Sequence, residues 1–365
     1  MMTNSAASHD FRYRSPSQVR VVIFGATGYI GRFVTYELLK RGYQVIVFAR
    51  EYSGIDANLG RHEVIKQFAG ASVCFGDVTD AASIANGAFS EPVDVVISCL
   101  ASRSGGRQDS WAIDYQATLN TLLEGINADI KHFILLSAIC VQKPELAFQK
   151  AKLAFEKALC TQTKITWSIV RPTAFFKSLS AQVELCRRGS PYIMFGDGKL
   201  TSCKPISEGD LASFIVDCIQ EQNRINQILP IGGPGPALST LQQAETLFRA
   251  LKRPLRTVSV PITFMDGAVG IFDRLAKLFP YLENQAEYAR IGRYYAKESM
   301  LIWNEKQQCY DESLTPSTGK DTLEDFFGRV VRDGLAGQEL GKAGIPGVNI
   351  IKGLSQRIRK ANNLV

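Results

Sequence analysis

The chain has 365 residues, enough to bury a substantial core, and its 45% hydrophobic and 21% charged fractions are ordinary for a globular protein. Its formal net charge of +7 favours anionic ligands, but no Lys/Arg block or aromatic-basic repeat indicates a nucleic-acid-binding protein. The eight cysteines form no C-x-x-C pair and the three histidines stand beside no cysteine or carboxylate cluster, so we expect neither a disulfide framework nor a metal site.

The first informative stretch is VVIFGATGYIGR, at residues 21–32. Its β-branched run predicts a buried parallel strand, and the apolar positions of residues 29–41 recur at helical spacing. Gly25 would permit a sharp turn, Gly28 would let backbone N–H groups approach a pyrophosphate, and Gly31 would let the helix pack on the strand. The helix N-terminus would then face the phosphates. We expect a dinucleotide site made by Gly25, Thr27, Gly28, Tyr29, Ile30, Gly31 and Arg32.

The end of the second strand, at residues 44–50, indicates which nucleotide binds. Enzymes that use NAD usually place an acidic residue there to hold the ribose 2′-hydroxyl, whereas a basic residue accommodates a 2′-phosphate. This strand ends in Arg50, and Arg32 is available beside the glycine loop. The sequence therefore predicts NADPH as the cofactor. Glu51 is the neighbour that argues for NADH, and a solvated Arg50 is the alternative.

Three more strands are expected to end beside the cofactor, because ligands in such sheets bind beyond the carboxyl ends of the strands. They lie at residues 72–77, 94–100 and 165–170. The first of these ends is the expected position of the adenine ring, and the second runs along the cofactor. We expect cofactor contacts from the residues at these ends: Asp77, Val78, Leu100, Ala101, Ser102, Arg171 and Pro172.

Two polar residues are candidates for catalysis. Ser137 stands at the carboxyl end of a strand at 132–138, over the expected nicotinamide, although a serine there is as often structural. Lys152 lies on a helix at 144–159, one turn from Phe148, so the two share a face. Lys152 could hold the nicotinamide ribose and lower a donor's pKa by its charge. The alternative is a solvated lysine paired with Glu156.

The pattern changes after Pro172. Residues 175–198 are dense in aromatics and glycines, Tyr192 among them, which suits either a wall for a large flat apolar ligand or core packing. An amphipathic helix at 262–279 could cap that cleft, touch a membrane or pack on its own domain. We predict an α/β fold with a Rossmann-type doubly wound parallel sheet at 19–172. A smaller C-terminal substrate-binding region follows at 173–337, with some elements returning to the sheet.

The two ends are expected to differ from this body. Residues 1–18 are polar and predict a disordered lead, and residues 338–365 form a basic tail that could make weak peripheral contact with an anionic membrane. No apolar run reaches the roughly 18 to 20 residues of a membrane-spanning helix, and no signal-peptide core is present. The default expectation is a bacterial cytoplasmic protein.

These motifs resemble the short-chain dehydrogenase/reductase superfamily, in its atypical NAD(P)-binding branch, over roughly residues 20 to 235. Within that branch the chain is similar to the 3,8-divinyl (proto)chlorophyllide 8-vinyl reductases, on the motifs GATGYIG, VIVFARE, FGDVTD, LLSAICVQKP, FQKAKLAFE, IVRPTAFFKSLS, MFGDGKL and CKPISEGDLA. The resemblance implies an enzyme that uses NADPH to reduce the 8-vinyl group of a tetrapyrrole, divinyl chlorophyllide or protochlorophyllide, during chlorophyll or bacteriochlorophyll synthesis. It also implies a plastid location if the source is eukaryotic and leaves peripheral placement at a photosynthetic membrane open.

One departure from the superfamily bears on the chemistry. The usual motif Y-x-x-x-K supplies a tyrosine proton donor, but Phe148 stands where that tyrosine would be and only Lys152 is kept. This argues against standard carbonyl reduction and suits a C=C substrate. The donor is left open among Lys152, Ser137, Tyr192 and water. Two other functions also stay open: an NADP-sensing regulator without turnover, and an isoflavone-reductase-like enzyme acting on another C=C bond.

Overall fold

The computed structural model describes residues 10–54, 59–279 and 282–335, and its centre is a parallel seven-stranded sheet. The strand order is β3-β2-β1-β4-β5-β6-β9. The chain therefore moves outward from β1 to one edge and then from β4 to the other, which creates the switch point where doubly wound sheets bind ligands. The strands are β1 Arg20–Phe24, β2 Gln44–Ala49, β3 Ser72–Phe75, β4 Val95–Ser98, β5 His132–Leu136, β6 Thr166–Pro172 and β9 Gln227–Ile231.

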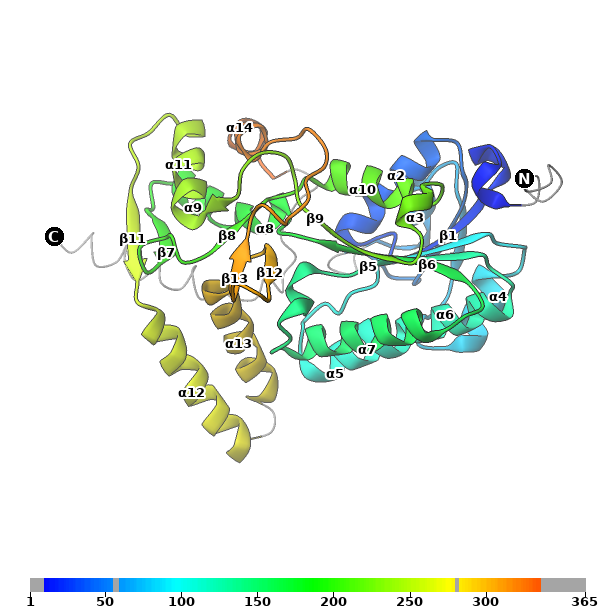
Figure 1. Ribbon diagram of the computed structural model, residues 1–365, viewed down its shortest axis with the longest axis horizontal. Helices are drawn as coiled ribbons and strands as arrows, with labels where there is room; N and C mark the ends of the chain where they lie inside the picture. Colours follow the sequence, from blue (N-terminus) through cyan, green and yellow to red (C-terminus); the bar gives the residue numbers. More distant parts are fainter. Residues whose placement is uncertain (1–9, 55–58, 280–281, 336–365) are drawn as a thin grey trace.

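Helices cover both faces of this sheet (Figure 1). Successive side chains of β1 point to opposite faces, so Val21 and Ile23 enter one buried cluster while Val22 and Phe24 enter another. The first face carries α2 Tyr29–Lys40, α3 Arg61–Gln67 and α10 Glu208–Asp217. The second carries α4 Ala81–Ala88, α6 Thr118–Asn127 and α7 Ala147–Thr161. Just before α6 come the one-turn helix α5 Arg107–Asp109 and a π-helical segment, η3 Ser110–Ala117.

The region after Pro172 is built of short helices and three two-stranded sheets beside the main sheet (Figure 1). Helices α12 Ile262–Leu278 and α13 Glu283–Lys297 form a hairpin that projects from this region. The paired strands of the region after Pro172 are β7 Tyr192–Phe195 with β11 Thr257–Val260, β8 Ser202–Cys203 with β10 Leu238–Ser239, and β12 Ile302–Asn304 with β13 Cys309–Asp311. Its helices are α8 Phe176–Leu179, α9 Val183–Arg187, α11 Thr240–Ala250, α12 Ile262–Leu278, α13 Glu283–Lys297 and α14 Leu323–Asp333.

Two elements of the later sequence belong to the main sheet layers. Strand β9 adds the last strand beside β6, and α10 packs against α2. Leu211 and Ile215 of α10 are fully buried in the same cluster as β1. The predicted α/β fold with a doubly wound parallel sheet is therefore confirmed.

The predicted disordered lead is wrong for residues 10–18. Two short 3-10 helices form there, η1 Phe11–Tyr13 and η2 Pro16–Gln18. Phe11 is buried and its ring stacks on His132 at 6.2 Å between centroids, which gives a polar segment an apolar anchor. Residues 1–9 and the expected basic tail at 338–365 lie outside the described residues. Within the described ranges, no helix is both long enough and apolar enough to cross a membrane.

Candidate active site

The glycine loop between β1 and α2 has the geometry expected of a phosphate-binding turn. Gly25 has a φ of +82°, which favours glycine, and a Cβ on Gly31 would lie 2.1 Å from the Gly25 carbonyl oxygen. Gly28 is the N-cap of α2 and its N–H donates to the Gly25 carbonyl at 3.0 Å. The turn and the helix therefore touch backbone to backbone, as the spacing predicted.

The side chains around this loop have separate neighbours. Ile30 is buried in the core, so any contact it makes with a cofactor comes from its backbone. Tyr29 donates its hydroxyl to Glu208 Oε2 at 2.9 Å, and the Lys177 ammonium lies 4.6 Å from its ring centroid. Burial raises the pKa of Tyr29 well above its usual range. The Arg32 guanidinium lies 5.8 Å from the same ring.

At the ends of β2 and β3 the expected nucleotide contacts are accessible. Arg50 is exposed, while the neighbouring Glu51 forms an ion pair with Arg61 at 3.0 Å. Asp77 is also exposed, and its carboxylate accepts the Thr79 N–H at 2.9 Å. Val78 packs partly buried against the core cluster beneath α4.

Lys152 is buried on α7 and pairs with a residue that the sequence pattern did not single out. Its ammonium lies 3.0 Å from Asp114 Oδ1, and both side chains are almost fully shielded. The other carboxylate oxygen of Asp114 accepts the Ser102 N–H at 3.3 Å. One carboxylate thus links Lys152 to the segment that follows β4, where the cofactor is expected. The alternative pairing of Lys152 with Glu156 is wrong.

Glu156 instead joins the ends of β5 and β6. Ser137 donates its hydroxyl to Glu156 Oε1 at 2.5 Å. Arg171 forms an ion pair with Oε2 and also donates from Nε to Oε1 at 3.2 Å. Because Glu156 holds both groups, Ser137 has a fixed orientation, and Arg171 reaches a carboxylate inside the protein.

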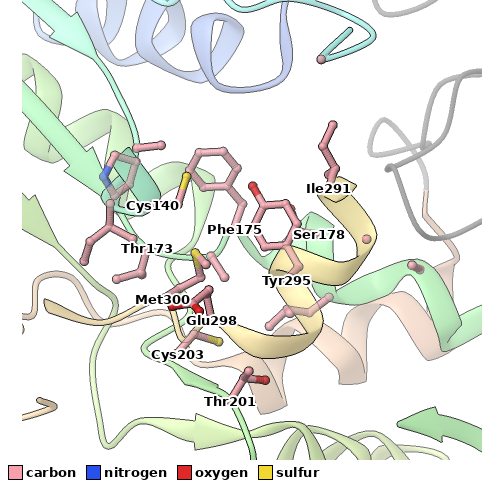
Figure 2. Close-up of a pocket in the computed structure, with 18 of the residues that line it drawn as sticks. Cys140, Thr173, Phe175, Ser178, Thr201, Cys203, Ile291, Tyr295, Glu298 and Met300 are labelled. Carbon is pink, nitrogen blue, oxygen red and sulfur yellow. The ribbon is translucent and has the colours of Figure 1, made fainter. Parts of the chain in front are cut away.

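These ends meet a cavity of about 510 Å³, a size common for sites that bind small molecules (Figure 2). Ser137, Phe148 and Lys152 border it from the sheet side, together with Leu100, Ala101, Ser102 and Pro172. The opposite walls are largely apolar and come from the later region. They include Phe175, Tyr192, Phe195, Met265, Tyr295 and Met300.

Comparisons with known proteins identify the family. The sequence matches the NAD(P)H-binding family over residues 25–222. It is 56% identical over 346 residues to the chloroplastic divinyl chlorophyllide a 8-vinyl-reductase of Arabidopsis thaliana, covering 92% of this chain and 82% of that protein. This chain belongs to the 8-vinyl-reductase family. The Zea mays reductase of the same name is 53% identical over 343 residues, covering 93% of this chain and 86% of that protein.

A solved structure agrees with the fold. Leucoanthocyanidin reductase of Vitis vinifera, in its binary complex with NADPH, superposes with a TM-score of 0.62 over 86% of this chain and 100% of that one. At 16% identity this likeness supports the Rossmann fold alone. Membership of the 8-vinyl-reductase family confirms the resemblance read from the motifs, and it favours the enzyme over the regulator without turnover.

In this 8-vinyl-reductase family member, Phe148 brings no hydroxyl to the position of the superfamily tyrosine. It borders the cavity and packs against a cluster that contains Cys140, Ile291 and Tyr294. Tyr192, a candidate donor, is only 3% exposed because its ring packs with Phe176 in another cluster, and burial raises its pKa above the usual range.

Sequence reasoning missed two functional candidates, Asp114 and Tyr295. Asp114 carried little signal in the sequence, because its burial follows from the packing of the π-helical segment η3 on α7. A buried carboxylate needs a cation, and Lys152 is that cation. Tyr295 carried no local signal, because its helix has mixed composition and reaches the cavity only through the tertiary fold.

Proposed function

We propose that this protein reduces the 8-vinyl group of divinyl chlorophyllide or protochlorophyllide to ethyl, with NADPH as the hydride donor. One observation carries this proposal: a large apolar cavity begins at Ser137 and Lys152, beside the switch point of the sheet, and extends between aromatic walls. A flat tetrapyrrole has the size and apolar character that such walls accommodate. The plant members of the family are named for the same substrate.

The residues present fit a nicotinamide dinucleotide. The close backbone contacts at Gly25 and Gly31 leave the α2 N-terminus open to a pyrophosphate. Leu100, Ala101 and Ser102 would follow the cofactor toward the cavity. When bound, the nicotinamide supplies a hydride.

Charge favours NADPH over NADH in this proposal. Arg50 is exposed at the end of β2, where a 2′-phosphate would lie, and Arg32 stands on the first turn of α2. Glu51, the residue that argued for NADH, is engaged by Arg61. A phosphate in this position would meet two arginines and a carboxylate that already has a partner.

Lys152 and Ser137 would orient the nicotinamide end of the cofactor. Lys152 would hold the nicotinamide ribose, and Asp114 would fix the direction of its ammonium. Ser137 would border the nicotinamide while its hydroxyl stays bonded to Glu156. The vinyl group can accept a hydride because the conjugated macrocycle spreads the resulting negative charge. Any magnesium would enter with the pigment.

The deciding experiment mixes the protein, NADPH and divinyl chlorophyllide and follows the Soret band, which shifts as the vinyl group leaves conjugation. We expect the shift together with one NADPH oxidised per pigment reduced. Tight NADPH binding without a Soret shift would refute the reductase function and favour a nucleotide sensor. Oxidation of NADPH by another activated alkene alone would favour the isoflavone-reductase-like alternative.

We propose further that the protein works beside a photosynthetic membrane, in a plastid or in a bacterial cell. The outer face of α12 presents Phe264, Ile271 and Leu278, which are 51%, 57% and 72% exposed, and Arg274 and Lys277 flank this stripe. A helix face of this kind suits an anionic lipid surface. Sedimentation with vesicles containing anionic lipid tests this contact, and Ile271→Glu should weaken it.

A further inference from the structure

A phenol enters the cavity from α13, far from the superfamily's tyrosine position in the sequence. Tyr295 lines the cavity and is 42% exposed, whereas the adjacent Tyr294 is 2% exposed. Figure 2 shows the Tyr295 ring among the cavity-lining side chains. A molecule in the cavity can therefore contact this side chain.

Hydrogen bonds fix the helix that carries Tyr295. Tyr294 donates its hydroxyl to the Cys140 carbonyl at 3.0 Å, in the segment that follows β5. Glu287 Oε1 accepts the Ala147 N–H at 2.7 Å, at the beginning of the helix that bears Lys152. Lys143 forms an ion pair with Glu298 at 2.8 Å. These contacts join α13 and its C-cap residue Glu298 to Cys140, Lys143 and the first residue of α7, so the neighbouring phenol is held in place.

The other candidate donors are less suited to give a proton. Ser137 donates to the Glu156 carboxylate, a strong acceptor, and Lys152 is held by Asp114. The Tyr295 hydroxyl interacts with the Cys140 thiol, which is a weak acceptor. Tyr192 is almost fully buried and leaves little surface in the cavity. Phe148 has no proton to give. Of the two described tyrosines that line the cavity, Tyr295 is the more exposed, at 42% against 3% for Tyr192.

We propose that Tyr295 is the proton donor of the vinyl reduction and takes the part of the tyrosine that Phe148 replaces. The proposal rests on the reductase function given above. Phe148 and Tyr295 both line the cavity, and Phe148 packs against the cluster that holds Ile291 and Tyr294 of α13. The hydroxyl has thus moved to another element while staying in the same cavity.

The reaction balances with this assignment. The hydride adds to the terminal vinyl carbon, which becomes the methyl group, and the C=C electron pair moves to the carbon attached to the macrocycle. That carbon forms a C–H bond with the phenol proton as the Tyr295 O–H bond breaks. The phenolate then takes a proton from water, so each turnover consumes one NADPH and one solvent proton.

The test is Tyr295→Phe, which removes only the hydroxyl. Tyr36→Phe is the matched control, because Tyr36 is 41% exposed on α2 and its hydroxyl contacts only the surface residue Gln67, at 3.2 Å, among the hydrogen bonds found. We expect Tyr295→Phe to slow vinyl reduction at saturating pigment by about 100-fold or more, the usual range for loss of a general acid. Pigment affinity, measured by absorbance titration without NADPH, should stay within about threefold. Tyr36→Phe should match the wild type in both.

Three outcomes are decisive. Turnover of Tyr295→Phe within about threefold of wild type would overturn the assignment and leave the reductase function standing. A loss confined to pigment affinity, with turnover at saturation unchanged, would also overturn it by making Tyr295 a binding contact. A wild-type protein that binds NADPH but reduces no vinyl group would refute the proposed function itself, and the donor assignment with it.

Discussion

Replacing Lys152 by methionine would leave the Asp114 carboxylate buried without its cation. The carboxylate side chain is 1% exposed, and its only other partner among the hydrogen bonds found is the Ser102 N–H at 3.3 Å. Breaking a buried pair by removing one member typically costs 3–5 kcal/mol, because an uncompensated charge remains. Since Lys152 borders the cavity and water there would screen the charge, we expect about 3 kcal/mol, the lower end of that range. Methionine keeps the length of the side chain, so packing changes little.

Urea unfolding of the cofactor-free protein measures this loss. A decrease of about 3 kcal/mol corresponds to roughly a 150-fold rise in the unfolding equilibrium constant. Adding Asp114→Asn removes the orphaned charge and should recover part of the stability. Vinyl reduction should stay low in both variants, with NADPH affinity within about tenfold of wild type, because the ribose contact is only part of the binding energy. A loss below about 1 kcal/mol, or a double variant no more stable than the single one, would refute the buried-pair argument.

Three further variants test other parts of the structure. Burial lowers the pKa of His132 to about 3, so between about pH 6.5 and 3 this imidazole takes up a proton only when the protein unfolds. The free energy of unfolding should therefore fall by about 1.4 kcal/mol per pH unit as the pH is lowered through that window. In urea titrations at several pH values, His132→Gln should show a smaller fall. Gly31→Ala should weaken NADPH binding at least about tenfold in a fluorescence titration, because its Cβ would meet the Gly25 carbonyl, whereas Gly328→Ala meets no atom within 4 Å and should bind normally. Arg50→Ala should lower the preference for NADPH over NADH, and an unchanged ratio of the two affinities would remove Arg50 from the 2′-phosphate site.

Local patterns were sufficient for most of the sheet. Apolar runs predicted β1, β2, β4 and β5, since a strand buried on both faces has a continuous apolar sequence. The glycine turn was also predictable from local sequence, because the close backbone contacts at Gly25 and Gly31 depend on a few adjacent residues.

Pairings between distant elements were not predictable in this way. Glu156 follows Lys152 by one helical turn, which made an ion pair between them plausible. In the folded protein Arg171 of β6 forms the ion pair with Glu156. Lys152 pairs instead with Asp114, in a helical segment more than thirty residues earlier. Tyr295 belongs to the same class, because only the packing of α13 on the β5–α7 connection brings it to the cavity. The prediction of disorder for residues 10–18 failed for a related reason, since Phe11 packs against the distant residue His132 and anchors this otherwise polar segment.

The late return of β9 and α10 to the main sheet has a consequence for synthesis. Until Gln227–Ile231 is available, β6 is an edge strand with unpaired backbone groups, and the apolar face of α2 lacks the cover of α10. The ribosome must therefore release most of the chain before the nucleotide-binding half can close. A nascent chain halted after Pro172 exposes both an unpaired strand edge and an uncovered hydrophobic helix face. Both features make a folding intermediate prone to aggregation, so this is the stage at which a chaperone is most needed.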